Sequence, residues 1–147
     1  MTRRIAVMVL FAAILLAGCT GQQQSQPAAD DTDAGTSPVD CSTVQGETHT
    51  VSYSSDGFSP QQLTVQRCDT VRWESSGAGM WVGSDRHPTH TQYDGSSVNQ
   101  HCPNQGDAFD QCSTGATYSF TFEKTGEFGY HNHVRAAHGG TVVVEER

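Results

Sequence analysis

Histidines are the residues of this chain best suited to metal chemistry. His131, His133 and His138 fall within eight residues near the C-terminus, and His87 and His90 form a second group in a polar segment. Imidazole nitrogen is a good ligand for Cu(II) and for Zn(II). The sequence therefore predicts a metal site built from these five histidines, with copper as the expected metal and zinc as the alternative.

The spacing of His131 and His133 predicts how they are presented. Side chains at positions i and i+2 of a strand point to the same face, so this pair can bind one ion. By the same alternation Phe128, Tyr130 and Asn132 point to the opposite face, toward the core. The pair is therefore expected on the outer face of its sheet, unless the strand ends at Asn132 and releases His133.

The remaining histidines and the methionine next to Trp81 have simpler interpretations. His49 and His101 are expected on the surface. Met80 carries a thioether that could act as a soft ligand, but its apolar surroundings favour a place in the core. Trp81 is expected to pack at the rim of the core.

The N-terminus carries an export signal. Within residues 1–18, two arginines precede an apolar run that is too short to favour a membrane-spanning helix. The run ends in Leu-Ala-Gly-Cys19, which resembles the lipobox of prokaryotic lipoproteins and implies that Cys19 becomes the lipidated N-terminus. An ordinary cleaved signal peptide is the alternative. Residues 19–40 are too polar to fold and are expected to form a disordered tether. The chain is therefore predicted to be exported and anchored by its lipid to the outside of the cytoplasmic membrane or in the cell envelope.

The charge of the exported chain restricts its partners. Removal of residues 1–18 takes away two of the eight basic residues and leaves all sixteen acidic ones, a net charge of −10. Nucleic-acid binding requires a basic face that neutralises phosphate, so that class of function is excluded. The membrane is expected to be contacted through the lipid anchor alone.

Four cysteines follow the lipidation site. An even number of cysteines in an exported domain favours disulfides over metal thiolates, and no Cys-x-x-Cys spacing occurs among them. Three pairings are possible. Cys41–Cys68 with Cys102–Cys112 is favoured because Cys102 and Cys112 flank one loop rich in Gly, Asn and Asp. Such bonds would remove all four sulfurs from the set of metal ligands.

Residues 41–147 are expected to form one all-β domain. Alternating or β-branched apolar residues predict short strands, and turns rich in Gly, Pro and Asn separate them. No apolar repeat of 3.6 residues extends beyond a few positions. About seven or eight short strands indicate an antiparallel sandwich or barrel. The main strands are expected at 48–54, 62–66, 70–74, 80–83, 117–122, 126–130 and 141–144.

Two parts of the chain resemble the cupredoxins of the plastocyanin and amicyanin type. The first contains Asp-Gly-Phe-Ser-Pro (56–60), Leu-Thr-Val (63–65) and Asp-Thr-Val-Arg-Trp (69–73). The second contains Tyr-Ser-Phe-Thr-Phe (118–122), Thr-Gly-Glu-Phe (125–128) and Tyr-His followed by Gly-Thr-Val-Val-Val (140–144). The resemblance covers about residues 47–145. It implies a Greek-key β-sandwich with a copper site at one end.

The resemblance also implies ligand positions, and this chain departs from them. The thiolate ligand of that pattern falls on Asn132, the first histidine on Met80, and the axial methionine on His138, while Arg135 lies about where the second loop histidine is expected. Asn132 and Met80 are therefore possible vestigial ligand positions. A carboxamide oxygen is a far poorer ligand for Cu(I) than a thiolate, which argues against a conventional blue-copper carrier.

Three classes of function follow. The first is a membrane-tethered copper-binding module that captures or transfers copper, or carries electrons, with a redox or copper-trafficking protein as partner. The second is a histidine-only copper enzyme such as a superoxide dismutase. The third is a metal-free interaction domain on a degenerate cupredoxin fold, because a fold alone does not determine function. A protein that is not an enzyme is the more favoured interpretation.

Overall fold

The computed structural model describes residues 39–77 and 79–147. The predicted signal peptide, the lipidation site Cys19 and most of the 19–40 tether lie outside the described residues. Of the tether, Val39 contacts the domain through an N–H donated to the carbonyl of Glu123 at 3.1 Å. In the described part of the chain, no helix has the length and apolar character needed to cross a membrane.

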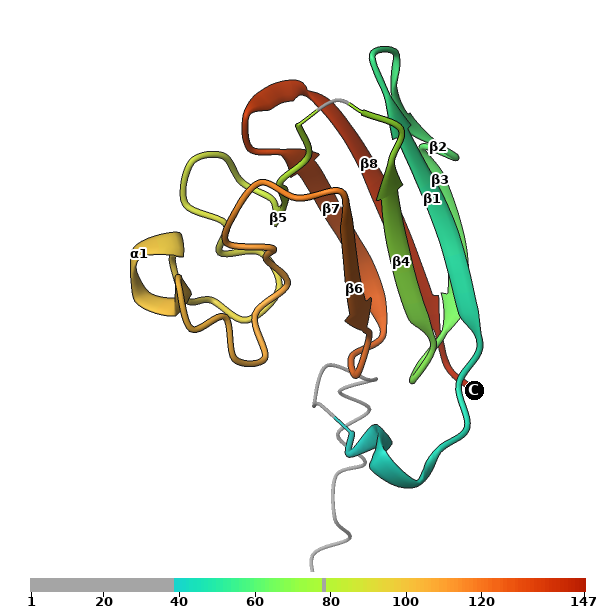
Figure 1. Ribbon diagram of the computed structural model, residues 1–147. Coiled ribbons are helices and arrows are strands. Elements are labelled where there is room, and N and C mark those ends of the chain that lie inside the picture. The colour runs from blue at the N-terminus through green and yellow to red at the C-terminus, as the bar shows by residue number, and fades with distance from the viewer. Residues whose placement is uncertain (1–38, 78) are drawn as a thin grey trace, which may run out of the picture. The chain divides into compact units, whose positions relative to one another are not determined.

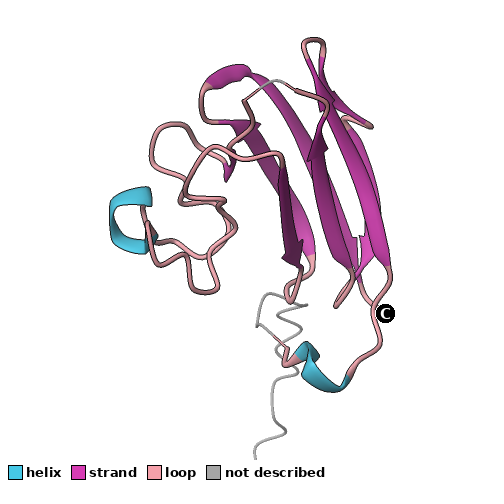
Figure 2. Ribbon diagram, viewed as in Figure 1, coloured by secondary structure: helices cyan, strands magenta, loops and turns pink. Residues whose placement is uncertain are grey.

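Strands account for nearly all of the regular structure (Figures 1 and 2). The first half contains β1 (Thr48–Ser54), β2 (Gly57–Ser59), β3 (Gln62–Gln66), β4 (Thr70–Ser75) and β5 (Val82–Ser84). The second half contains β6 (Thr117–Thr121), β7 (Gly126–Asn132) and β8 (Arg135–Glu145). Two short helices, η1 (Cys41–Thr43) and α1 (Val98–His101), complete the described elements.

The strands form two four-stranded sheets, in the orders β2-β1-β4-β6 and β3-β8-β7-β5. This arrangement confirms the predicted all-β sandwich. Each sheet nevertheless contains one parallel pair, β1 with β4 and β3 with β8, so the sheets are mixed rather than wholly antiparallel as expected. Strand β8 is also longer than the predicted 141–144 strand, because it begins at Arg135 directly after a two-residue turn.

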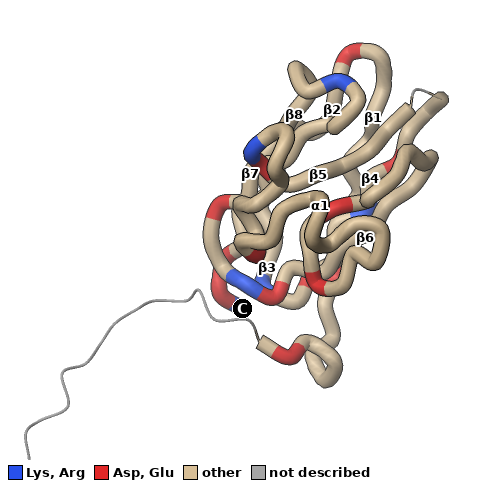
Figure 3. Tube along the Cα trace, turned by 90° about the vertical axis from the view of Figure 1, so that its left-hand side faces the viewer, with Lys and Arg blue, Asp and Glu red and all other residues tan. Residues whose placement is uncertain are grey.

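Acidic and basic residues differ in how they are distributed along the domain. Acidic positions are spread over the trace of the described domain, whereas basic positions are few and separated (Figure 3). Acidic residues therefore outnumber basic ones in the described part of the chain.

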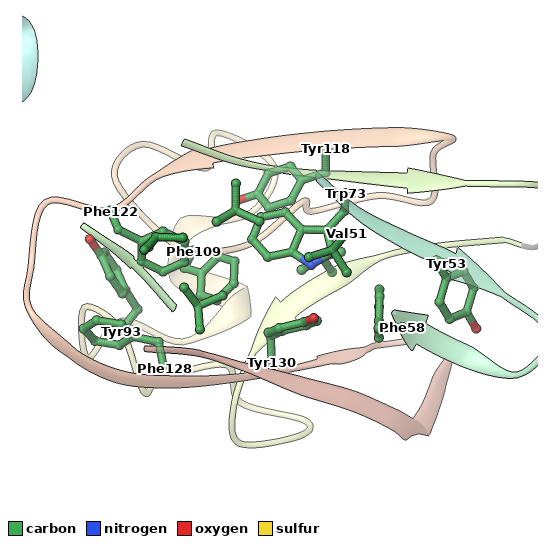
Figure 4. Close-up of a cluster of buried hydrophobic side chains, with 14 of the residues drawn as sticks. Val51, Tyr53, Phe58, Trp73, Tyr93, Phe109, Tyr118, Phe122, Phe128 and Tyr130 are labelled. Atoms are coloured by element: carbon green, nitrogen blue, oxygen red, sulfur yellow. The ribbon is translucent and has the colours of Figure 1, made fainter. Parts of the chain in front are cut away.

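The core lies between the two sheets and is mainly aromatic (Figure 4). Alternation in β1 and β4 turns Val51, Tyr53, Val71 and Trp73 inward, which is the pattern that predicted these strands. Trp73 is fully buried, and its ring lies 5.6 Å from that of Tyr118 in a stacked arrangement. Aromatic rings of this size bury much apolar surface each and dominate the packing energy of a small domain.

The long segment 85–116 between β5 and β6 lies at one side of the sandwich (Figure 1). Two of its aromatic residues, Tyr93 and Phe109, are buried in the core, and the ring of Phe109 lies 5.4 Å from that of Trp73. The Cys102–Cys112 disulfide closes part of this segment, and Cys41–Cys68 joins the start of the domain to the β3–β4 turn. Both disulfides have the pairing that the sequence favours.

Candidate metal centre

Four of the five predicted ligands come together. His87, His90, His131 and His133 each offer a ring nitrogen, and these nitrogens all lie within 4.8 Å of one another. His87 Nδ1 is 3.2 Å from His131 Nε2, and His133 Nδ1 is 2.8 Å from His90 Nε2. We call these four residues the histidine cluster. It joins the 85–116 segment to the end of β7.

The end of β7 places His131 and His133. His131 lies on the opposite side of the strand from Tyr130 and Asn132, which face the core, as strand alternation predicts. The strand ends at Asn132, and the pairing with β8 shifts register between His131 and Asn132. His133 therefore lies in the turn, where its N–H donates to the carbonyl of Trp81 at 2.7 Å. The His131 side chain thus lies on the face of β7 opposite the aromatic core, and His133 follows in the turn.

The loop after β5 places His87 and His90. The N–H groups of Thr89 and His90 both donate to the carbonyl of Arg86 at 2.8 Å, which closes a tight turn. The Ser84 hydroxyl then donates to the carbonyl of His90, also at 2.8 Å. The ring of His90 lies directly over Gly83, where any side chain would collide with it. Gly83, which pairs with His131, therefore leaves the space that the His90 ring occupies.

Each of the two buried histidines contacts a carboxylate through its Nδ1. His131 donates from Nδ1 to Asp85 Oδ1 at 3.0 Å, and Gly129 leaves the space that the Asp85 carboxylate occupies. His90 donates from Nδ1 to Asp110 Oδ2. Carboxylates in this position fix the orientation and tautomer of metal-binding histidines and raise their basicity.

Asp110 is the more strongly held of the two carboxylates. It is fully buried, and its Oδ1 accepts hydrogen bonds from Trp81 Nε1 at 2.7 Å and from the N–H of Cys112 at 2.8 Å. Burial by itself would raise the pKa of Asp110, but hydrogen bonds from His90, Trp81, Cys112 and His101 outweigh it and lower the pKa to about 2. The carboxylate is therefore ionised at neutral pH and keeps a hydrogen on His90 Nδ1.

These contacts determine which nitrogens are free. With hydrogens on Nδ1, both His90 and His131 present the lone pair of Nε2 to the middle of the cluster. His87 and His133 contact these lone pairs through Nδ1. Burial first, and then the neighbouring rings of His90, His87 and His131, lower the pKa of His133. The neutral form of the His133 ring, which is the form that binds a metal, is therefore favoured.

The spacing fits a single ion. Tetrahedral bonds of 2.0–2.1 Å from a metal to imidazole nitrogens place the nitrogens about 3.3 Å apart. The two contacts of 3.2 and 2.8 Å lie close to that value. His90 and His131 are buried, His133 is half-buried and His87 is exposed, so the cluster opens to solvent on the His87 side.

His138 is not part of the cluster, although the sequence predicts it as a ligand. It lies within β8, and its Nδ1 is 3.2 Å from the hydroxyl of Tyr53. The prediction assumed a loop in this region. Because β8 already begins at Arg135, the 11-residue strand carries His138 along the sheet and away from the four other histidines.

The two vestigial positions are both core residues. Asn132 is fully buried and accepts from the N–H of Trp81 at 3.0 Å, while its Nδ2 donates to the Tyr53 hydroxyl at 2.7 Å and to the carbonyl of Gly79 at 3.0 Å. Met80 is also fully buried. The Asn132 carboxamide is therefore engaged in structural hydrogen bonds within the core.

Sequence reasoning missed several residues that support the cluster. His101, expected on the surface, is buried, and its Nε2 lies 3.1 Å from Asp110 Oδ2. Away from the cluster, His49 was also expected on the surface, but it is half-buried, and its Nε2 lies 3.0 Å from Asp69 Oδ2. Asp85 precedes His87 by two residues, so its place near the histidines could have been predicted from the sequence. Asp110 could not have been found in this way, because 20 residues separate it from His90.

Comparison with known proteins gives the fold. No protein-family model matches the chain, and no curated protein matches it. Among solved structures, an oxidized methionine-to-leucine mutant of amicyanin matches with a TM-score of 0.51 and 21% identity, over 76% of this chain and 95% of that one. A reduced tryptophan-to-tyrosine mutant of amicyanin matches with a TM-score of 0.49 and 21% identity, over 74% and 92%. Together with the two-sheet architecture, the match to the oxidized form shows that this chain has a cupredoxin-like fold.

Proposed function

We propose that this domain is an exported copper-binding module whose site is the histidine cluster. The observation that carries the proposal is the convergence of four imidazole nitrogens, two of them backed by carboxylates. Carboxylates that hold the rings in one orientation are a common feature of histidine metal sites. The thiolate-free set belongs to nitrogen-ligated Cu(II) rather than to blue copper.

Copper is favoured over zinc by affinity. A given set of nitrogen ligands binds Cu(II) more tightly than Zn(II) in the Irving–Williams order. The cluster offers four imidazole rings and no thiolate, so nothing in it selects zinc. Copper added to the zinc-loaded protein is therefore expected to displace the zinc.

The exposure of the cluster suits exchange with a partner. His87 is exposed on one side while His90 and His131 are buried, so an incoming protein can reach the ion without unfolding the site. The acidic domain would favour a basic docking surface on a redox or copper-trafficking partner. We further propose that a lipid on Cys19 holds the module at the membrane surface.

Metal analysis combined with EPR tests the proposal. The metal-free protein is expected to bind one Cu(II), and the EPR spectrum is expected to show a wide parallel hyperfine splitting typical of nitrogen ligation. The His131→Ala variant is expected to lose this signal. His49→Gln is the matched control, because His49 lies outside the cluster, and it should keep the signal.

Two results would contradict the proposal. One is a folded protein that takes up no copper. The other is a narrow parallel hyperfine splitting, which would require a thiolate ligand that the histidine cluster lacks.

A further inference from the structure

A second group of metal-ligating side chains lies beside the histidine cluster. Nitrogen, sulfur and oxygen atoms of His101, Cys102, Asp110 and Cys112 all lie within 4.8 Å of one another. None of the four residues of the histidine cluster belongs to this group. Its two sulfurs are joined as a disulfide. We call these four residues the cysteine group.

Two parts of the 85–116 segment bring the group together. His101 is the last residue of α1, and Cys102 follows as its C-cap. On the other side, Asp110 pairs with Gly83 of β5, and the N–H of Gln111 donates to the carbonyl of Val82 at 2.8 Å. The second part is thereby fixed to a sheet edge, so Asp110 and Cys112 hold their places independently of the disulfide.

His101 and Asp110 already face each other with atoms that a metal can use. His101 Nε2 lies 3.1 Å from Asp110 Oδ2, and both residues are buried. On the other side of the ring, His101 Nδ1 lies 2.8 Å from Ser96 Oγ, and this contact holds the ring in place. An imidazole nitrogen and a carboxylate oxygen at this distance can bind the same cation.

The disulfide is within reach of a reductant. Cys102 and Cys112 are both half-buried, whereas in the other disulfide Cys41 is half-buried and Cys68 is buried. A dithiol can therefore attack either sulfur of the Cys102–Cys112 bond. In that exchange the dithiol is oxidised to its own disulfide, and the Cys102–Cys112 bond takes up two electrons and two protons to give two thiols.

We infer that the cysteine group is a latent second metal site, closed by its disulfide and opened by a dithiol reductant, for a thiophilic cation such as Zn(II) or Cu(I). Two thiolates and an imidazole are ligands that these cations prefer, and Asp110 completes the set. The Cα atoms of the two cysteines, 5.3 Å apart, allow both sulfurs to reach one ion. Binding releases the two thiol protons.

This inference does not rest on the proposed function, since only Asp110 is shared between the two sites. Asp110 Oδ2 contacts both His90 and His101. A metal that draws on Asp110 would thus compete with its support of His90.

Co(II) is a suitable probe, because thiolate ligands give it a charge-transfer absorption that imidazole ligands do not. The full domain is reduced with a dithiol, freed of reductant without air, and titrated with Co(II) and then Zn(II). The reduced protein is expected to bind one more equivalent than the oxidised protein and to show the thiolate band, which Zn(II) removes. His101→Ala should weaken this second equivalent by about 10-fold or more.

A double variant, Cys102→Ser with Cys112→Ser, supplies the matched control, because it keeps the Cys41–Cys68 disulfide. After reduction it is expected to show no thiolate band. The inference is overturned if the folded reduced protein shows no band, if the band persists in the double variant, or if reduction abolishes the near-UV circular dichroism of the fold. Copper binding by the oxidised protein tests the histidine cluster separately.

Discussion

Asp110 is a single residue on which much of the site depends. It is buried and ionised, and it receives hydrogen bonds from both halves of the 85–116 segment and from Trp81. In the proposed copper site of the histidine cluster its role would be positional: it keeps the hydrogen of His90 on Nδ1 and so leaves Nε2 free. A change that preserves the shape of Asp110 but not its charge should therefore alter the metal affinity.

We predict that Asp110→Asn weakens copper binding by about 10–100-fold. The carboxamide keeps one acceptor for Trp81 and turns its amide hydrogens toward His90, which forces the hydrogen of that ring onto Nε2. Competition titration with a copper chelator measures the effect. Asp107→Asn, an exposed position in the same segment, is the control and should bind copper normally. Equal affinities in the two variants would show that Asp110 does not act through His90.

His133 gives the metal-free domain a dependence on pH. Its pKa is lowered from 6.5 in the folded protein, so the unfolded chain binds a proton there at a higher pH than the folded chain does. The contribution of His133 to stability is therefore complete above pH 6.5 and is lost as the pH falls through the folded pKa. Denaturant unfolding at about pH 7.5 and about pH 5.5 should show a smaller loss in His133→Asn than in the wild type. Equal losses would assign the effect to other groups.

At the scale of elements, the 85–116 segment connects the core to the site. Phe109 is inserted among the rings between the sheets, and the next residue is Asp110. The N–H of Ser84 donates to the carbonyl of Phe109 at 2.9 Å, which aligns this part of the segment with β5. Core packing thus sets the position of the carboxylate that holds His90.

We predict that Phe109→Ala lowers the free energy of unfolding by about 3–5 kcal/mol and also weakens copper binding. The change leaves a cavity next to Trp73 and frees the segment that carries Asp110. Denaturant unfolding and copper titration measure the two effects. Val134→Ala, at a side chain that is 55% exposed, should change stability by no more than about 0.5 kcal/mol. Unchanged copper affinity in Phe109→Ala would mean that the loop keeps its place without the core contact.

Strands could be predicted from the sequence because their burial alternates. Val51 with Tyr53, and Val71 with Trp73, give a period of two that only a strand with one buried face produces. The start of β8 could not be predicted in this way. Arg135 to Ala137 are exposed and show no alternation, so nothing in their side chains distinguishes a strand from a loop.

The cluster was accessible to sequence reasoning for a similar reason. His131 and His133 are close together in the sequence, and so are His87 and His90. Both pairs lie at connections between strands, which a sandwich can bring together. His101 and Asp110 were not accessible. Their burial depends on the path of a polar segment whose local sequence contains no periodic signal, and only the inserted Phe109 and Tyr93 fix that path.

At the scale of the whole molecule, the domain must be considered with its predicted N-terminal tether. A flexible segment of about 20 residues would let the domain range roughly 25 Å from its anchor. This reach would bring an acidic module to partners in the same membrane.

We predict that Cys19→Ala moves the exported protein from the membrane fraction to the soluble fraction. A single amino-acid change then removes the lipid attachment while the copper site is unaffected. Fractionation followed by immunoblotting measures the distribution, and Cys102→Ser with Cys112→Ser is the control that keeps the anchor. Retention of the Cys19→Ala protein in the membrane fraction would contradict lipid anchoring.

The contact between Trp81 and His133 has an optical consequence. Their ring centroids are 4.2 Å apart with an angle of 33°, so a copper ion on His133 would lie close enough to Trp81 to quench its light emission. The other tryptophan, Trp73, emits from the buried core. Fluorescence of a Trp73→Phe variant should therefore fall in step with added Cu(II) and remain nearly constant with Zn(II), which has a filled d shell. Emission from Trp81 would then report the occupancy of the proposed copper site in real time without any added dye.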